Sequence, residues 1–208
     1  MSVPPGARTL HSADIAAHGE FRHLNTIAGI AVDLRYATPD NFVGRDLYTP
    51  LDCAWLHRDA AAALERAVAW LAARHPAYRL LVLDALRPQS VQEQLWAALQ
   101  GTELLGYIAE PSRGSIHSFG MALDVTIVDG AGRELDMGTG FDDLSERSHP
   151  ALEPALLARG ELTAAHVANR QLLRDAMFQA GWLGINSEWW HFDCGDRIKV
   201  RQTYARVL

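Results

Sequence analysis

The sequence predicts a single α+β domain with a mainly antiparallel central sheet flanked by helices. The chain has 208 residues, a length typical of one large domain. Hydrophobic residues make up 49% of it and charged residues 21%, enough apolar material for a core that needs neither disulfides nor a structural metal. Strand-like and helix-like segments interleave without a regular βαβ rhythm, which favours an antiparallel sheet. We therefore interpret residues 1–208 as one domain, with residues 1–25 expected to be in part loosely ordered.

Four elements are predicted in the first half of the chain. Apolar and other residues alternate over residues 30–36, as in a short strand. Residues 59–75 are rich in Ala and Leu and predict a helix that Pro76 helps to end. The apolar run at residues 79–85 is typical of a buried strand. A helix is expected over residues 90–99, after a proline that suits a first helical turn.

The second half continues the alternation of strands and helices. Residues 121–128 predict another strand, and the sequence DGAG at residues 129–132 predicts a hairpin-like turn. Residues 134–163 are charged and contain several Gly and Pro, so we expect a long irregular segment, which is often functional. Residues 164–180 form a second long helical pattern. The aromatic segment at residues 187–193 is strand-like.

Charge and composition limit the classes of partner. The formal net charge of -6 lacks the basic footprint of nucleic-acid binding and disfavours an anionic membrane surface. The sequence shows neither a signal-like apolar stretch near its start nor an apolar run of membrane-spanning length, so we expect a cytoplasmic protein. In that compartment Cys53 and Cys194, the two cysteines, are expected to be reduced.

Three side chains of the kinds that bind metals stand in two short segments. His117 and Asp124 lie in SIHSFGMALD, and His191 lies in EWWHFD. Catalytic zinc sites take three such ligands and leave a fourth position open. On one straight strand His117 and Asp124 would face opposite sides, so the bend that Gly120 permits is needed to bring them together. Asp124 also interrupts an apolar run, where a buried carboxylate needs a partner or a metal.

Glu188 comes three residues before His191. On a regular strand the two would face opposite ways, so we expect Glu188 in a bend just before the strand. From there its carboxylate could act as a general base on water activated by the metal. Each of these residues also has an ordinary interpretation, as a loop histidine, a solvated carboxylate or a hydrogen-bonded core histidine. Spacing alone leaves both interpretations open.

Together the two segments resemble a known family. Ser115-x-His117-x-x-Gly120-x-Ala122-x-Asp124, followed by Glu188-x-Trp190-His191, is similar to the metal motif of the D-alanyl-D-alanine peptidases related to hedgehog and lysostaphin. Further segments resemble the dipeptidase branch, the vancomycin-resistance D-Ala-D-Ala dipeptidases: DLRYATPDNFVGR at 33–45, DALRP at 84–88, DMGTGFD at 136–142, SERSH at 145–149 and EWWHF at 188–192. The resemblance runs from about residue 30 to about residue 195, and its two-part metal motif is specific.

The resemblance implies a hedgehog-like and D,D-peptidase-like fold, and zinc-dependent hydrolysis of D-alanyl-D-alanine to two D-alanines. By this resemblance His117, Asp124 and His191 would bind one zinc ion per chain. Glu188 would be the general base and later the proton donor to the leaving amine. The expected partner is a small dipeptide, with no nucleic acid or membrane, and homo-oligomerisation stays open.

The resemblance also implies roles outside the metal motif. Arg87, which matches the arginine of the DxxRP segment, would stabilise the tetrahedral oxyanion, and Asp84 would orient it by an ion pair. Tyr36, Ser115 and Asp142 are expected to hold the substrate. Asp142 would face the substrate ammonium.

Two alternative functions follow from the same residues. A D,D-carboxypeptidase or endopeptidase acting on peptidoglycan stem peptides would use the same metal set in an open groove. A non-catalytic zinc-binding domain would need a closed site, for which Cys194 is the nearby fourth ligand, but such a site has no use for Glu188 and Arg87. For a dipeptidase, both protection from glycopeptide antibiotics and recycling of cell-wall dipeptide are compatible with the sequence.

Overall fold

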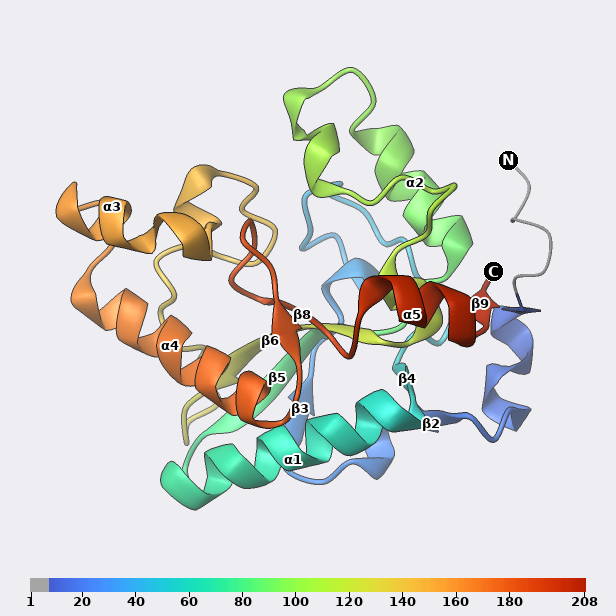
Figure 1. Cartoon of the computed structure of the whole chain (residues 1–208), viewed down its shortest axis with the longest axis horizontal. Coiled ribbons are helices and arrows are strands. Elements are labelled where there is room, and N and C mark those ends of the chain that lie inside the picture. The colour runs from blue at the N-terminus through green and yellow to red at the C-terminus, as the bar shows by residue number, and fades with distance from the viewer. Residues whose placement is uncertain (1–7) are drawn as a thin grey trace.

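A five-stranded sheet with the strand order β3–β5–β6–β8–β7 forms the centre of the computed structural model, which describes residues 8–208 (Figure 1). Its strands are β3 (Ile30–Val32), β5 (Arg79–Asp84), β6 (Ala122–Val128), β7 (Leu183–Gly184) and β8 (His191–Asp193). β3 pairs with β5 in parallel, and the other three pairs are antiparallel. The predicted α+β fold with a mainly antiparallel sheet is confirmed.

Two long helices cover one face of this sheet. These two are α1 (Arg58–Arg74) and α4 (Ala164–Gln179). The other α-helices of the described residues are α2 (Gln89–Ala98), α3 (Glu153–Ala158) and α5 (Arg197–Thr203). Buried residues of α1 recur at helical spacing, namely Ala60, Leu64, Ala67 and Leu71. They share one core with residues of α4 and with the inward side chains of β5 and β6. No helix within residues 8–208 has the length and apolar character needed to cross a membrane.

Two small sheets and several 3-10 helices complete the fold. β1 (Thr9–Leu10) pairs in parallel with β9 (Arg206–Val207), and β2 (Phe21–His23) pairs antiparallel with β4 (Trp55–His57). The 3-10 helices are η1 (Ser12–Ala17), η2 (Leu24–Thr26), η3 (Arg35–Ala37), η4 (Glu103–Tyr107), η5 (Ile116–Phe119), η6 (Glu146–Ser148) and η7 (Pro150–Leu152). β1, η1 and β2 lie in the segment that was expected to be in part loosely ordered. Figure 1 shows β1 and β9 at one end of the molecule, beside α5.

Three predicted elements differ from the structure. The strand predicted at residues 30–36 ends at Val32, because the chain then turns into η3. The segment predicted to be irregular contains α3, since Pro154 stands in the first turn of that helix, where proline is favourable. The strand predicted at residues 187–193 begins only at His191, which leaves Glu188 in a bend before it, as expected.

An irregularity in β5 redirects one carboxylate towards the other face of the sheet. Leu80 and Val82 face the core under α1, and simple alternation would place Asp84 there too. The pairing with β6 shifts between Val82 and Asp84, so that Asp84 lies opposite Asp124. Such a bulge re-aims the following side chain. Asp84 and Asp124 therefore share the face of the sheet that is turned away from α1.

Candidate metal centre

The structure brings together the three side chains predicted to bind a metal. His117 comes from η5, Asp124 from β6 and His191 from β8, and one donor atom of each lies within 4.8 Å of the others. The Nε2 atom of His117 is 3.2 Å from Nδ1 of His191, which is 3.0 Å from Oδ1 of Asp124. His117 and Asp124 are buried, and His191 is 9% exposed. The donors thus converge on one point at the floor of a cavity.

Local backbone geometry explains how this convergence arises. Asp124 and His191 are direct neighbours across the β6–β8 pair. Ser115 caps η5, where its hydroxyl accepts the His117 backbone N–H at 3.3 Å. Gly120 ends η5 with a φ of 63°, a left-handed conformation that glycine adopts readily. This is the bend that the sequence predicted, although His117 stands on a short 3-10 helix and not in a plain loop.

Neighbouring oxygens hold the second nitrogen of each imidazole ring. Nδ1–H of His117 donates to the carbonyl oxygen of Ala85 at 2.8 Å. Nε2–H of His191 donates to Oδ1 of Asp193 at 3.0 Å, and Oδ2 of Asp193 accepts from Nε of Arg197 at 2.5 Å. These bonds turn the other nitrogen of each ring towards a common point, the arrangement found around metal-binding histidines.

The donor set fits a zinc ion at a catalytic site. Two imidazoles and one carboxylate are ligands that zinc takes in open sites with three protein ligands. Within residues 8–208, Cys194 is not part of the converging group, so a closed site with a fourth thiolate ligand is not formed here. Burial would lower the pKa of His191, but the carboxylates of Asp193 and Asp124 outweigh it and raise that pKa to about 10. The site therefore attracts positive charge.

Asp193 is a residue of this centre that the sequence reasoning missed. It stands two residues after His191 on β8, and side chains two apart on a strand share a face. The spacing of the sequence HFD could therefore have indicated it.

Arg87 lies buried beside the donors, with 6% of its surface exposed. Its Nε donates to Oδ2 of Asp84 at 2.9 Å, as the predicted ion pair requires, and its Nη2 approaches Oδ2 of Asp124 at 3.4 Å. Asp84 is fully buried and also accepts the hydroxyl of Tyr48 and, at 2.8 Å, the backbone N–H of Ala85. Asp84 thus fixes the guanidinium of Arg87, which also lines the cavity.

Tyr36 and Asp142 form a second polar pair at this cavity. The Tyr36 hydroxyl donates to Oδ1 of Asp142 at 3.1 Å, and the Phe42 backbone N–H approaches Oδ2 at 3.5 Å. Burial, with the nearby charge of Asp124, raises the pKa of Asp142 to about 8. The backbone of Asp142 has a φ of 61°, which is uncommon for a residue other than glycine and often accompanies a functional site.

Glu188 lines the same cavity as the three donors and has no hydrogen-bond partner within residues 8–208. Burial raises the pKa of this carboxyl group to about 7. The two tryptophans that follow it, Trp189 and Trp190, are buried and pack edge to face against each other. Glu188 therefore lies at the same cavity as the donors without being one of them.

The cavity itself has a volume of about 170 Å³. Ser115, the cap of η5, also lines it, next to His117. The further lining residues, which the sequence reasoning did not assign to the site, include Tyr107, Arg113, Arg197 and Arg201.

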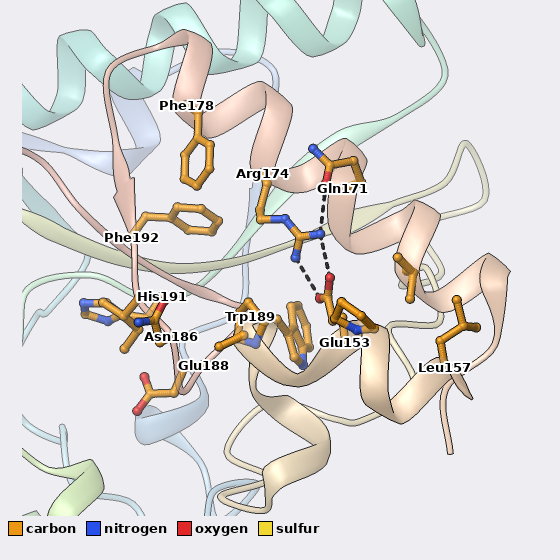
Figure 2. A pocket seen from close by; sticks show the side chains of 16 residues that line it. Glu153, Leu157, Gln171, Arg174, Phe178, Asn186, Glu188, Trp189, His191 and Phe192 are labelled. Atoms are coloured by element: carbon orange, nitrogen blue, oxygen red, sulfur yellow. Dashed lines mark hydrogen bonds and ion pairs between the residues drawn. The ribbon is translucent and has the colours of Figure 1, made fainter. Parts of the chain in front are cut away.

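A larger groove of about 550 Å³ lies on the other side of the segment that carries Glu188. Figure 2 shows the ion pair between Glu153 and Arg174 on one side of this groove, with Glu188 and His191 on the side away from it. The groove is lined mainly by apolar side chains from α3, α4 and β8. Apart from His191 and Glu188, it shares none of the polar groups of the metal centre.

Comparison with known proteins agrees with this geometry. Residues 18–208 match the model of the M15 peptidase family described as D-ala-D-ala dipeptidase. A D-alanyl-D-alanine dipeptidase of Escherichia coli (strain K12) is 38% identical over 167 residues, covering 79% of this chain and 78% of that protein. Proteins of the same name from Enterococcus faecalis and Streptomyces coelicolor are 32% and 29% identical, covering 79% and 84% of this chain and 85% and 91% of their own lengths. The chain therefore belongs to the D-ala-D-ala dipeptidase family of M15 metallopeptidases.

Proposed function

We propose that this chain hydrolyses D-alanyl-D-alanine to two D-alanines with one zinc ion held by His117, Asp124 and His191. The observation that carries the proposal is the convergence of these three donors in a small cavity that also holds a free carboxylate, Glu188. The three relatives compared above are all named for this dipeptide. The described residues would act together as one catalytic domain.

Glu188 would handle the protons of the reaction. A zinc ion at this site supplies Lewis acidity, which polarises the scissile carbonyl and makes a nearby water molecule easier to deprotonate. Glu188 accepts the proton of the attacking water on a carboxylate oxygen. It then delivers this proton to the nitrogen of the leaving D-alanine. A carboxyl group whose pKa burial raises to about 7 suits both transfers near neutral pH.

Arg87 would stabilise the negative oxygen that forms on the attacked carbon. A guanidinium has five N–H donors, and Arg87 uses them on Asp84, Asp124 and, at 3.3 Å, the side-chain oxygen of Gln92. One N–H of Nη1 is left for a substrate oxygen. Because the ion pair with Asp84 fixes the group in advance, little reorganisation is needed when the charge develops.

Asp142 and Tyr36 would select the free amino end of the dipeptide. An ammonium group next to Asp142 favours the ionised carboxylate and replaces the water that burial has removed. The hydroxyl of Tyr36 keeps one carboxylate oxygen in place. A small cavity that pairs the ammonium in this way leaves little room for the preceding residues of a stem peptide.

The first test is hydrolysis by the purified chain of D-Ala-D-Ala, L-Ala-L-Ala and a stem pentapeptide, each with and without a chelator. We expect cleavage of the free D,D-dipeptide alone, abolished by the chelator and restored by zinc. Cleavage of the pentapeptide in preference to the dipeptide would instead make the chain a carboxypeptidase. A zinc-loaded chain that cleaves none of the three would be a binding domain.

The role of Glu188 is tested by Glu188→Gln, which keeps the shape of the side chain and removes its basicity. We expect kcat for D-Ala-D-Ala to fall by about 10²- to 10⁴-fold, the usual contribution of a general base. Zinc content, measured by atomic absorption, should stay at one per chain. Glu161→Gln, at an exposed position outside the cavity, is the matched control and should behave as the wild type. Full turnover in zinc-loaded Glu188→Gln would remove this residue from the mechanism.

A further inference from the structure

Three arginines line one part of the cavity. Arg113 precedes η5, and Arg197 and Arg201 stand one helical turn apart on α5. Within residues 8–208, no carboxylate lies within ion-pair distance of Arg113 or Arg201, and Arg197 pairs only with Asp193. This local excess of positive charge contrasts with the net charge of -6 of the whole chain.

Backbone oxygens hold Arg201 in place and leave its charge uncompensated. Its Nε and Nη2 donate to the carbonyl of Gly114 at 3.2 and 3.0 Å, and its Nη1 donates to the carbonyl of Arg197 at 3.3 Å. These bonds fix the guanidinium plane but supply no negative charge. Burial lowers the pKa of Arg201, and the charges of Arg113 and Arg197 lower it further. An anion at this position would relieve that repulsion.

The opposite charge lies elsewhere around the cavity. Asp142 accepts the hydroxyl of Tyr36, whose ring lies 5.0 Å from the guanidinium carbon of Arg87, whereas Arg201 stands on α5 and binds the carbonyl of Gly114. Gly114, which Arg201 binds, directly precedes Ser115, the cavity residue next to His117. The cavity therefore presents the carboxylate of Asp142 beside Tyr36 and a separate cluster of guanidinium groups around Arg201. A dipeptide with free ends carries the matching pair of charges.

We propose that Arg201, with Arg113 and Arg197 beside it, binds the C-terminal carboxylate of the dipeptide. This inference rests on the proposed function, which supplies the substrate. Arg201 is the main contact because its guanidinium is fixed in advance, whereas Arg113 is exposed and Arg197 is engaged with Asp193. A charged guanidinium pairs with a carboxylate more strongly than a neutral donor does. Arg201 is thus a specificity-determining residue that favours a free carboxylate at this end.

The test compares D-Ala-D-Ala with D-alanyl-D-alaninamide, which keeps the ammonium and lacks the terminal charge. Arg201→Gln retains a side-chain donor for Gly114 and removes the positive charge. We expect it to raise KM for D-Ala-D-Ala about tenfold with little change in kcat. The preference for the acid over the amide, measured as a ratio of kcat/KM values, should fall by a similar factor. Arg201→Lys, which restores a charge, should recover part of that preference.

Lys199→Ala is the matched control, because it removes one positive charge from α5 at an exposed residue that does not line the cavity. It should leave both substrates unaffected. Equal KM values for D-Ala-D-Ala in Arg201→Gln and Lys199→Ala would overturn the assignment. An Arg201→Gln variant that loses kcat/KM equally for the acid and the amide would overturn it too.

A binding measurement separates this inference from the proposed function. The dissociation constant of D-Ala-D-Ala is measured by calorimetry on the zinc-loaded Glu188→Gln chain, with and without Arg201→Gln. We expect about tenfold weaker binding in the double variant. A wild-type chain that binds the dipeptide but does not cleave it would end the proposed function, and the calorimetry would still decide the role of Arg201. Unchanged affinity in the double variant would end the inference even if the wild type is active.

Discussion

The imidazole of His191 is oriented by residues that would not themselves touch a metal. Asp193 holds its Nε2, and Arg197 holds the other oxygen of Asp193. This chain of bonds runs from α5 into the donor group. It fixes the ring so that Nδ1 faces His117 and Asp124, and it increases the basicity of that nitrogen. We therefore expect metal affinity to depend on Asp193 as well as on the three donors.

Asp193→Asn tests this dependence. An amide can still accept a hydrogen bond from Nε2, but it lacks the charge that stabilises the ring and its pair with Arg197. We expect zinc affinity, measured by competition with a chromophoric chelator, to fall by about 10- to 100-fold. Asp175→Asn, at a half-buried site on α4 outside the cavity, is the control and should bind zinc normally. Equal affinities in the two variants would show that Asp193 has no influence on the metal.

Sequence patterns predict some residues of the metal centre and its cavity and not others. The two-part motif predicted His117, Asp124 and His191, because ligands with short, fixed spacing leave a recognisable pattern. Asp193 could have been added from its alternate position on the strand. Arg201 could not, because its place at the cavity depends on how α5 packs against η5, and sequence distance carries no trace of that packing.

At the scale of elements, the turn from η5 into β6 sets the angle between two donors. Gly120 lies in the left-handed region, and its backbone packs closely against β4 and β2. A Cβ atom added there would lie 2.7 Å from the backbone nitrogen of His57 and 2.9 Å from the Phe21 ring. Since neither the His57 backbone nor the buried ring can move freely, the position admits only glycine.

Gly120→Ala should therefore lower the free energy of unfolding by about 2–4 kcal/mol, which combines left-handed strain with the steric overlap. Gly132→Ala is the matched control, because Gly132 has a φ of 81° with open space around it. There only the strain remains, about 1–2 kcal/mol. Urea denaturation of the metal-free chains measures both values. Equal losses in the two variants would mean that the contact with His57 is easily relieved.

The errors in the predicted elements have two physical causes. β3 ends at Val32, before the end of the segment in which apolar residues alternate, because the chain then turns into η3. α3 was not predicted, because the Pro and charged residues around it are typical of irregular structure. In the structure Glu153 is buried at the start of α3, and its two carboxylate oxygens accept hydrogen bonds from the two Nη atoms of Arg174 at 2.7 and 2.8 Å. Such a tertiary contact stabilises a helix too short to form alone.

For the whole molecule, fold class followed from composition and from the rhythm of the segments, whereas strand order did not. β5 and β6 are separated by α2, η4 and η5 and still pair as neighbours, and β3 joins β5 in parallel. These strands pair because their inward side chains are buried in one common core under α1 and α4. Periodicity in a single sequence identifies a strand but not its partner.

A metal that joins three elements should stabilise the whole fold. Zinc at about 1,000 times its dissociation constant adds about 4 kcal/mol if it binds only the folded chain. For a chain of this size that corresponds to a rise in Tm of roughly 8–16 °C. Calorimetry with zinc and with a chelator measures the difference. His117→Ala should bind no zinc and show no shift, and a full shift in that variant would place the metal elsewhere.

The distribution of the donors along the chain also has a consequence for metal choice in the cell. His117 and His191 stand 74 positions apart and meet only when β6 and β8 are paired. A nascent or unfolded chain therefore offers no preformed site that could capture the most strongly binding ion available, such as copper. Metal selection would therefore wait until the sheet has fixed the spacing and number of ligands. The folded architecture, rather than the order in which ions are encountered, would decide which metal binds.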